Sequence, residues 1–129
     1  MAEPKRLQLA VVHAMHQLQI EEHGGLDGVR DAGLLESALA RPQNRYAYEG
    51  SGIIELAACY AAGIAKNHPF LDGNKRTAFL AAYTFLAHNG IRLTATQPEA
   101  TAATLALAAG ELNEGQFARW LAEHSIELP

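Results

Sequence analysis

Several residue types are scarce in this chain of 129 residues, and each scarcity excludes a class of protein. Cys59 is the only cysteine, so an internal disulfide and a cysteine zinc cluster are excluded, and its thiol is expected to be a small buried hydrophobe. No apolar run reaches the roughly 18 residues that cross a bilayer, and residues 1–15 lack a secretory-leader pattern. We therefore expect a cytoplasmic protein that does not enter a membrane.

Residues that favour β-strands are also few. Valine and isoleucine together supply 9 residues against 25 alanines, and no segment alternates between apolar and polar residues as a strand would. The length suits one hydrophobic core, and no repeat or linker divides the chain. We therefore predict a single all-α domain over residues 1–129, a compact bundle of about six helices.

Positive charge is the scarcer sign. The 10 Lys and Arg residues face 14 Asp and Glu, and the net charge of -4 argues against direct binding of DNA or RNA. Lys66, Lys75 and Arg76 nevertheless lie close together in the sequence, while Arg41 and Arg45 fall in a connection that could fold over them. A small basic focus in an acidic protein suggests a discrete anion such as a nucleotide phosphate.

Apolar periodicity, caps and stop signals predict the helices. They are expected at about 6–22, 32–41, 53–67, 74–88, 96–109 and 113–124, with a short β-leaning stretch at 91–95. The helix at 74–88 is apolar almost all round, which predicts a buried centre for the domain. Capping boxes at Thr96–Glu99 and Asn113–Gln116 mark the last two helix starts.

Three local expectations concern the first half of the chain. The first helix should bury one face, made of Leu7, Val11, Ala14 and Leu18, and its His13 and His16 are expected to be a solvated or hydrogen-bonded pair rather than metal ligands. Pro42 should end the second helix, so that residues 42–52 form a polar connection, either pinned to the core by its tyrosines or acting as a substrate-docking flap. Ser51 is the expected cap of the next helix.

The chemistry of the chain is concentrated in residues 67–77, Asn-His-Pro-Phe-Leu-Asp-Gly-Asn-Lys-Arg-Thr. His68 suits a general base, because its pKa is ordinarily near neutrality. Asp72 suits Mg²⁺, although capping the next helix is an alternative role. Gly73 and Asn74 would open a helix whose free N–H groups attract an anion.

Lys75 and Arg76 add two positive charges at the same helix start. Together these groups provide a base, a metal carboxylate, an anion site and a charge clamp, as phosphoryl or nucleotidyl transfer requires. The order does not fit a Walker A loop, since Lys75 is followed by Arg76 rather than Ser or Thr. The alternative from the residues alone is a capped helix start with solvated charges, on a structural or interaction protein.

The stretch from His68 to Arg76, His-Pro-Phe-Leu-Asp-Gly-Asn-Lys-Arg, resembles the signature of the Fic/Doc superfamily. It is most similar to the death-on-curing (Doc) toxins of bacterial type II toxin–antitoxin modules. The resemblance extends over nearly the whole chain and includes Gly24-Gly25, Arg30-Asp31 with Gly33, Arg41-Pro42-Gln43, Tyr48, residues 61–67 and residues 108–111. It implies a Fic/Doc-type helical bundle with a buried central helix after the motif loop.

The resemblance also implies an activity. Doc toxins act as protein kinases that transfer the γ-phosphate of ATP to a threonine of the elongation factor EF-Tu, which arrests translation. By position, His68 would be the base on the target hydroxyl and Asp72 the Mg²⁺ ligand, while the residues from Gly73 to Arg76 would hold the phosphates. A target-docking flap would correspond to about Arg41 to Tyr48. The expected partner is an antitoxin whose disordered tail folds on the toxin.

Two positions separate the chain from the related enzymes that transfer AMP. Those enzymes have glycine where this chain has Lys75, and a second arginine where it has Phe79. A lysine narrows the space for an α-phosphate, and the loss of the arginine removes a clamp for pyrophosphate. The interpretation is therefore a Doc-type Ser/Thr kinase, and the alternatives are AMP transfer, a non-catalytic toxin that binds the translation machinery, and an RNase.

Overall fold

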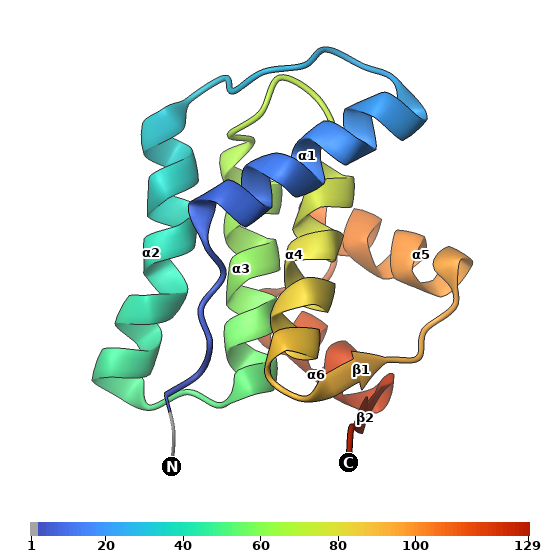
Figure 1. The fold of residues 1–129 in the computed structure, drawn as a ribbon. Helices are drawn as coiled ribbons and strands as arrows, with labels where there is room; N and C mark the ends of the chain where they lie inside the picture. Colours follow the sequence, from blue (N-terminus) through green and yellow to red (C-terminus); the bar gives the residue numbers. More distant parts are fainter. Residues whose placement is uncertain (1–2) are drawn as a thin grey trace.

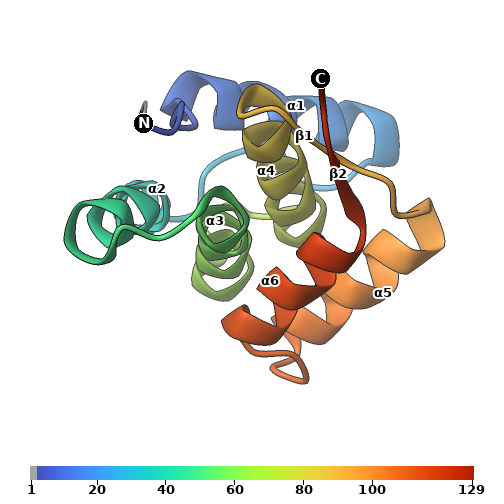
Figure 2. The ribbon, with the colours of Figure 1, turned by 90° about the horizontal axis from the view of Figure 1, so that it is seen from below.

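Helix α3 (Ile53–Asn67) lies at the centre of the fold in the computed structural model, which describes residues 3–129 (Figure 1). Every residue from Leu56 to Ala65 is buried. Seen along the helix axes, α2 (Ala32–Glu49), α4 (Asn74–His88) and α6 (Glu114–Glu123) surround it (Figure 2). Small side chains allow this close approach on several sides, since most of these buried residues are alanine or glycine.

Two further helices and a small sheet complete the domain. Helix α1 (Leu9–His23) crosses α4 at one end of the bundle, and α5 (Gln97–Ala108) packs on α4 and α3. Strands β1 (Ile91–Leu93) and β2 (Ser125–Glu127) pair antiparallel, with Arg92 opposite Ile126. The described residues thus form six helices with one two-stranded sheet, which confirms the all-α prediction.

The local start and stop signals were read correctly in the second half of the chain. Thr96 and Glu99 form the capping box of α5, and Asn113 and Gln116 form that of α6. Helix α4 begins at Asn74 and follows the motif loop into the interior, as expected. The helix before it, α3, is buried still more completely. Strand β2 was not predicted, because three residues carry too little periodicity to be recognised.

The predicted end of α2 at Pro42 is wrong, and so is the predicted loop after it. The helix continues to Glu49, so the segment from Arg41 to Tyr48 is helical and is neither a flap nor a pinned loop. Pro42 lacks the N–H that would bond to Ala38, but its ring is fully buried. Burial of the Pro42 ring, together with the packing of α2 on α3, offsets the cost of one lost hydrogen bond.

Two smaller predictions in the first half also fail. Of the expected apolar face, Leu7 is buried and Val11 is partly buried against the core, but Ala14 and Leu18 are exposed. The buried residues of α1 itself are Val12, Met15 and His16. The cap of α3 is Gly52 rather than Ser51: the Gly52 N–H donates to the Glu55 side chain. Among residues 3–129, no helix has both the length and the apolar character to cross a membrane.

Candidate active site

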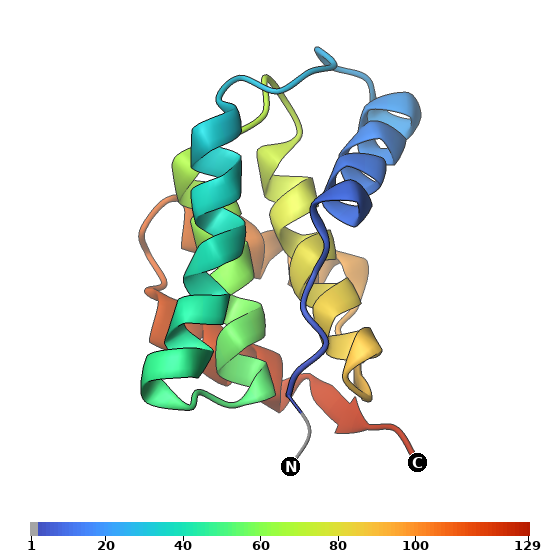
Figure 3. The same cartoon turned by 60° about the vertical axis from the view of Figure 1, so that its left-hand side comes forward.

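The motif loop, residues 68–73, lies at one end of the bundle beside the loop of residues 24–31 (Figures 1 and 3). The two segments run antiparallel and are joined by backbone hydrogen bonds. The Arg30 and Asp31 N–H groups donate to the Pro69 carbonyl at 2.7 and 3.0 Å, and the Leu71 N–H donates to the Gly28 carbonyl at 3.1 Å. A long loop from the start of the chain therefore braces the predicted catalytic loop.

His68 occupies the end of α3 in an unusual backbone conformation. Its φ of 47° and ψ of 55° are left-handed, and it is the one non-glycine residue with positive φ among residues 3–129. Residues other than glycine are uncommon in this region, although Asn, Asp and His enter it more often than others, and residues held there cluster at functional sites. His68 is exposed, so the imidazole at the end of α3 is accessible to solvent.

Arg30 supports that conformation from the neighbouring loop. Its Nε–H donates to the His68 carbonyl at 2.6 Å and its Nη2–H donates to the Asn67 carbonyl at 2.7 Å. These are two of the carbonyls that the end of a helix leaves without a partner. A cation at the negative end of the α3 dipole is also favourable. Arg30 thereby ties the end of α3 to the loop before α2.

The Asn74 side chain forms two hydrogen bonds with the backbone in the middle of the motif loop. This side chain is nearly buried, and its Nδ2–H donates to the Phe70 carbonyl while its Oδ1 accepts from the Phe70 N–H, both at 3.0 Å. Phe70 itself is 1% exposed. The carboxamide is therefore used to shape the loop, and the group that Asn74 leaves for a ligand is its backbone N–H.

Asp72 has an exposed carboxylate, of which one oxygen accepts a hydrogen bond. Its Oδ2 accepts from the Leu26 N–H at 2.7 Å, and its Oδ1 accepts no hydrogen bond from residues 3–129. Residues 3–129 contain no cluster of three or more side chains that could hold a metal by themselves. A single carboxylate suits Mg²⁺ that arrives with a nucleotide, because this ion keeps waters and binds through one or two carboxylates plus the phosphates.

The start of α4 provides the positive groups. Gly73 caps the helix with a left-handed φ of 76°. The first helical N–H with a partner is that of Thr77, which donates to the Gly73 carbonyl at 3.0 Å, so the preceding N–H groups are left for a ligand. Lys75 and Arg76 are exposed, and neither forms an ion pair with another residue of 3–129.

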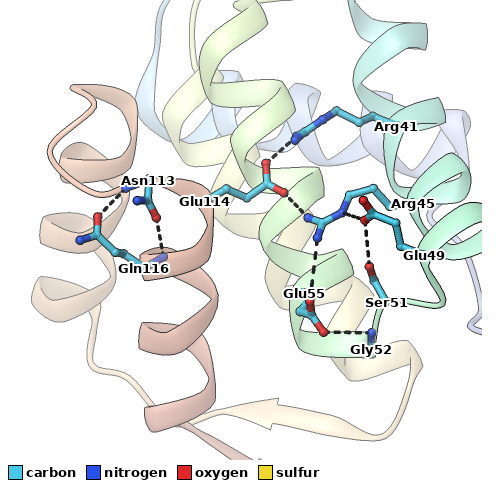
Figure 4. Close-up of polar contacts among 9 residues, drawn as sticks. All are labelled: Arg41, Arg45, Glu49, Ser51, Gly52, Glu55, Asn113, Glu114 and Gln116. Carbon is cyan, nitrogen blue, oxygen red and sulfur yellow. Dashed lines mark hydrogen bonds and ion pairs between the residues drawn. The ribbon is translucent and has the colours of Figure 1, made fainter.

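All six predicted site residues thus come together on one loop and the first turn of α4. The structure corrects one neighbour relationship: Arg41 and Arg45 do not lie over this loop. Both pair with Glu114 at the start of α6, at 2.6 and 2.5 Å, as Figure 4 shows. Arg45 also pairs with Glu49, and this hydrogen bond raises the pKa of the Arg45 guanidinium.

A cavity of about 400 Å³ lies beside the ion pairs of Arg41 and Arg45 with Glu114, and Lys66 also lines it. Cys59 is fully buried nearby, and burial raises the pKa of its thiol, which agrees with the structural role expected for it. The arginines therefore join α2 to α6 and are not available as clamps on a nucleotide at the motif.

Residues 6–86 of the chain match the family model described as the Fic/DOC family, which is more than half of its length. The chain belongs to the Fic/DOC family. Among its relatives, a protein named "Protein kinase doc" from Escherichia phage P1 is 38% identical over 106 residues, which cover 81% of this chain and 83% of the relative. "Toxin Doc" from Mycolicibacterium smegmatis is 47% identical over 74 residues, or 56% of this chain and 57% of the relative.

The Fic/DOC match contains every element of the candidate site. It begins just before α1 and ends within α4, so it includes the bracing loop, the motif loop and the first turn of α4. Sequence reasoning identified the motif but gave no role to Arg30 or to the Leu26 N–H, because both reach the motif only through the fold. It also left His16 outside the site, and the structure brings that residue into contact with the motif.

Proposed function

We propose that this Fic/DOC protein is the toxin of a toxin–antitoxin module and a Ser/Thr protein kinase that transfers the γ-phosphate of ATP to a hydroxyl of a translation factor such as EF-Tu. The observation that carries the proposal is the junction of α3 and α4. There an exposed imidazole, an exposed carboxylate and the free N–H groups of a helix start belong to one short, braced loop. The names of the two relatives, a protein kinase and a toxin, support it.

The reaction that these groups suit is an in-line phosphoryl transfer. His68 takes the proton of the target hydroxyl, whose oxygen forms a bond to the γ-phosphorus. The bond between that phosphorus and the bridging oxygen to the β-phosphate breaks, and ADP leaves. The N–H groups from Gly73 to Arg76, with the charges of Lys75 and Arg76, hold the phosphates. Asp72 would hold Mg²⁺, which neutralises phosphate charge when bound.

Phosphate rather than AMP is proposed as the transferred group because of two positions on α4. Phe79 is half-buried and packs against the Tyr83 ring, with ring centroids 6.2 Å apart, so it offers no cation to a leaving pyrophosphate. Lys75 is exposed and carries an ammonium at the position where enzymes that transfer AMP have glycine. Arg41 and Arg45 cannot replace the missing clamp, because both are paired with Glu114.

A toxin that arrests translation needs a neutralising partner. We propose a cognate antitoxin with a tail that is disordered alone and folds on the surface of this chain. The reaction would take place in the cytoplasm, where ATP and the translation factor are found. DNA binding is assigned to the antitoxin, in keeping with the net charge of -4 on this chain.

The test of the transferred group uses ATP labelled at either the γ or the α position. The purified chain is incubated with Mg²⁺ and a bacterial lysate, and label on protein is measured. We expect transfer of the γ label alone. Transfer of the α label would overturn the kinase proposal and indicate AMP transfer.

The test of catalysis compares two histidines that both lie at helix ends and are exposed. His68→Ala should lower the transfer rate by about a hundredfold or more, because it removes the base. His88→Ala, at the far end of α4, should leave the rate unchanged. In cells, His68→Ala should abolish growth arrest. Arrest that persists with a folded His68→Ala protein would instead indicate a toxin that acts by binding.

A further inference from the structure

We infer that His16 is a positioning residue that holds the Asp72–Gly73 peptide in the orientation needed for phosphate binding. This inference rests on the proposed function and adds a residue from α1 to the machinery of the motif. His16 acts through the backbone of the loop and has no contact with substrate in this account. Two observations carry it, a hydrogen bond and a ring stack, and the planar geometry of the peptide group supplies the consequence.

The hydrogen bond joins α1 to the carbonyl of the predicted metal ligand. The Nε2–H of His16 donates to the Asp72 carbonyl oxygen at 2.8 Å, and the residue is only 3% exposed. A neutral or charged imidazole can make this bond, provided that Nε2 carries the proton. The buried His16 ring therefore has a backbone group of the motif loop as its hydrogen-bond partner.

The ring stack fixes where this donor points. The imidazole lies on the Phe70 ring with centroids 3.8 Å apart and planes 7° from parallel. Phe70 is in turn held through its backbone by the Asn74 carboxamide. His16 is thus locked between a fixed aromatic ring and the turn at Gly73, where an added Cβ would come within 3.7 Å of the imidazole.

The consequence follows from the geometry of a trans peptide. The carbonyl and the N–H of one peptide unit point in opposite directions, because the unit is planar. When His16 draws the Asp72 carbonyl inward toward α1, the Gly73 N–H must point away from α1. That N–H lies at the start of α4, among the free donors proposed to hold phosphate.

The orientation of the Asp72–Gly73 peptide group needs a restraint, because the second residue of the pair is glycine. Gly73 populates positive and negative φ with similar ease, so the Asp72–Gly73 peptide can rotate at little steric cost. Rotation by half a turn would direct a carbonyl oxygen at the phosphate and remove one donor. The second anchor, from the Leu26 N–H to the Asp72 carboxylate, holds the side chain and leaves the peptide plane free. His16 provides the missing restraint.

His13 offers a matched control on the same helix. It is exposed and meets the Phe70 ring edge-on, with centroids 6.2 Å apart, and its side chain makes no hydrogen bond within residues 3–129. His13→Phe should therefore leave kinetics unchanged. His16→Phe keeps the ring stack and removes the donor. His16→Gln removes the ring but restores an N–H donor near the position of Nε2.

The experiment measures kcat and KM for ATP in these three variants, together with the amide resonance of Gly73 by ¹H–¹⁵N NMR during titration with a non-hydrolysable ATP analogue and Mg²⁺. For His16→Phe we expect kcat/KM to fall about tenfold or more, as for the loss of one preorganised donor, and the Gly73 amide to lose its response. His16→Gln should recover most of both. Unchanged circular dichroism shows that each variant is folded. If His16→Phe does not fold, His16→Met takes its place as the variant without a donor.

Two results would overturn the inference. One is a folded donor-free variant whose Gly73 amide responds as in the unmodified chain. The other is an equal loss in His16→Gln and His16→Phe, which would indicate packing alone. Failure of the proposed function is seen separately, as the absence of any transfer by the unmodified chain, and the Gly73 titration remains informative in that case because it needs binding rather than catalysis.

Discussion

Replacement of Asn74 by alanine tests how the motif loop is held together. The carboxamide of Asn74 pairs with both the N–H and the carbonyl of Phe70, and within residues 3–129 these two groups make no other hydrogen bond. Alanine removes both bonds at once and is a better helix former than asparagine at the start of α4. A loss of stability in this variant therefore cannot come from a loss of helix propensity.

The magnitude follows from the burial of Phe70. A buried backbone group left without a partner costs about 1–3 kcal/mol, and two such groups, with some relaxation, cost about 2–4 kcal/mol. A domain of this size is stable by about 5–15 kcal/mol, so the variant should still fold. The melting temperature should fall by about 10 °C.

Asn89 provides the matched comparison. Its carboxamide also pairs with the N–H and the carbonyl of one residue, Lys5, at 2.7 and 3.0 Å, but these bonds are exposed. Water can replace them. The Asn89 Nδ2–H also donates to the Phe85 carbonyl at 2.8 Å in a partly buried bond, so Asn89→Ala should cost about 1–2 kcal/mol, less than Asn74→Ala. Urea denaturation followed by circular dichroism gives both values. Equal losses in the two variants would refute the view that the buried doublet at Phe70 holds the loop.

Three other predictions concern different parts of the molecule. Gly63→Ala should lower the free energy of unfolding by about 1–3 kcal/mol in urea titrations, because its Cβ would lie 3.2 Å from the Cβ of Ala38 where α3 meets α2. The hydrogen bond from the Thr96 N–H lowers the pKa of Glu99, so this cap stabilises the fold at pH values above the ordinary pKa of 4.5 and the stabilisation is lost as the pH falls through the folded-state pKa. In Glu99→Gln, this part of the pH dependence of the free energy of unfolding should be absent. Cys59 should react with iodoacetamide at least about a hundredfold more slowly in the native protein than in urea, because burial raises its pKa and the reaction requires opening.

Features governed by neighbouring residues could be predicted from the sequence. The bounds of α3, the start of α4 and the two capping boxes follow from signals that lie within a few residues of each helix end. The motif was recognisable for the same reason, since its base, carboxylate and positive charges lie within one short stretch. These are short-range properties, and the structure reproduces them.

Features governed by contacts between distant segments could not be predicted. Pro42 stays within α2 because its ring is buried, which no local rule reveals. Arg41 and Arg45 lie on the continued helix α2 rather than in a loop over the motif, and both pair with Glu114, far along the chain. His16 was predicted to be part of a solvated or hydrogen-bonded pair with His13. Its spacing from Val12 and Met15 matches a buried stripe of α1. The sequence does not show which group would pair with a polar side chain in that stripe, because the partner comes from a distant segment.

The central claim is that the loop between α3 and α4 moves a single phosphoryl group onto a protein hydroxyl. The most direct measurement is the intact mass of purified EF-Tu after incubation with this chain, ATP and Mg²⁺, beside the same mixture containing His68→Ala. The account predicts a mass increase of one phosphoryl group on EF-Tu with the unmodified chain and none with the variant. A mass increase of one AMP group, or an equal phosphoryl gain with His68→Ala, would contradict it.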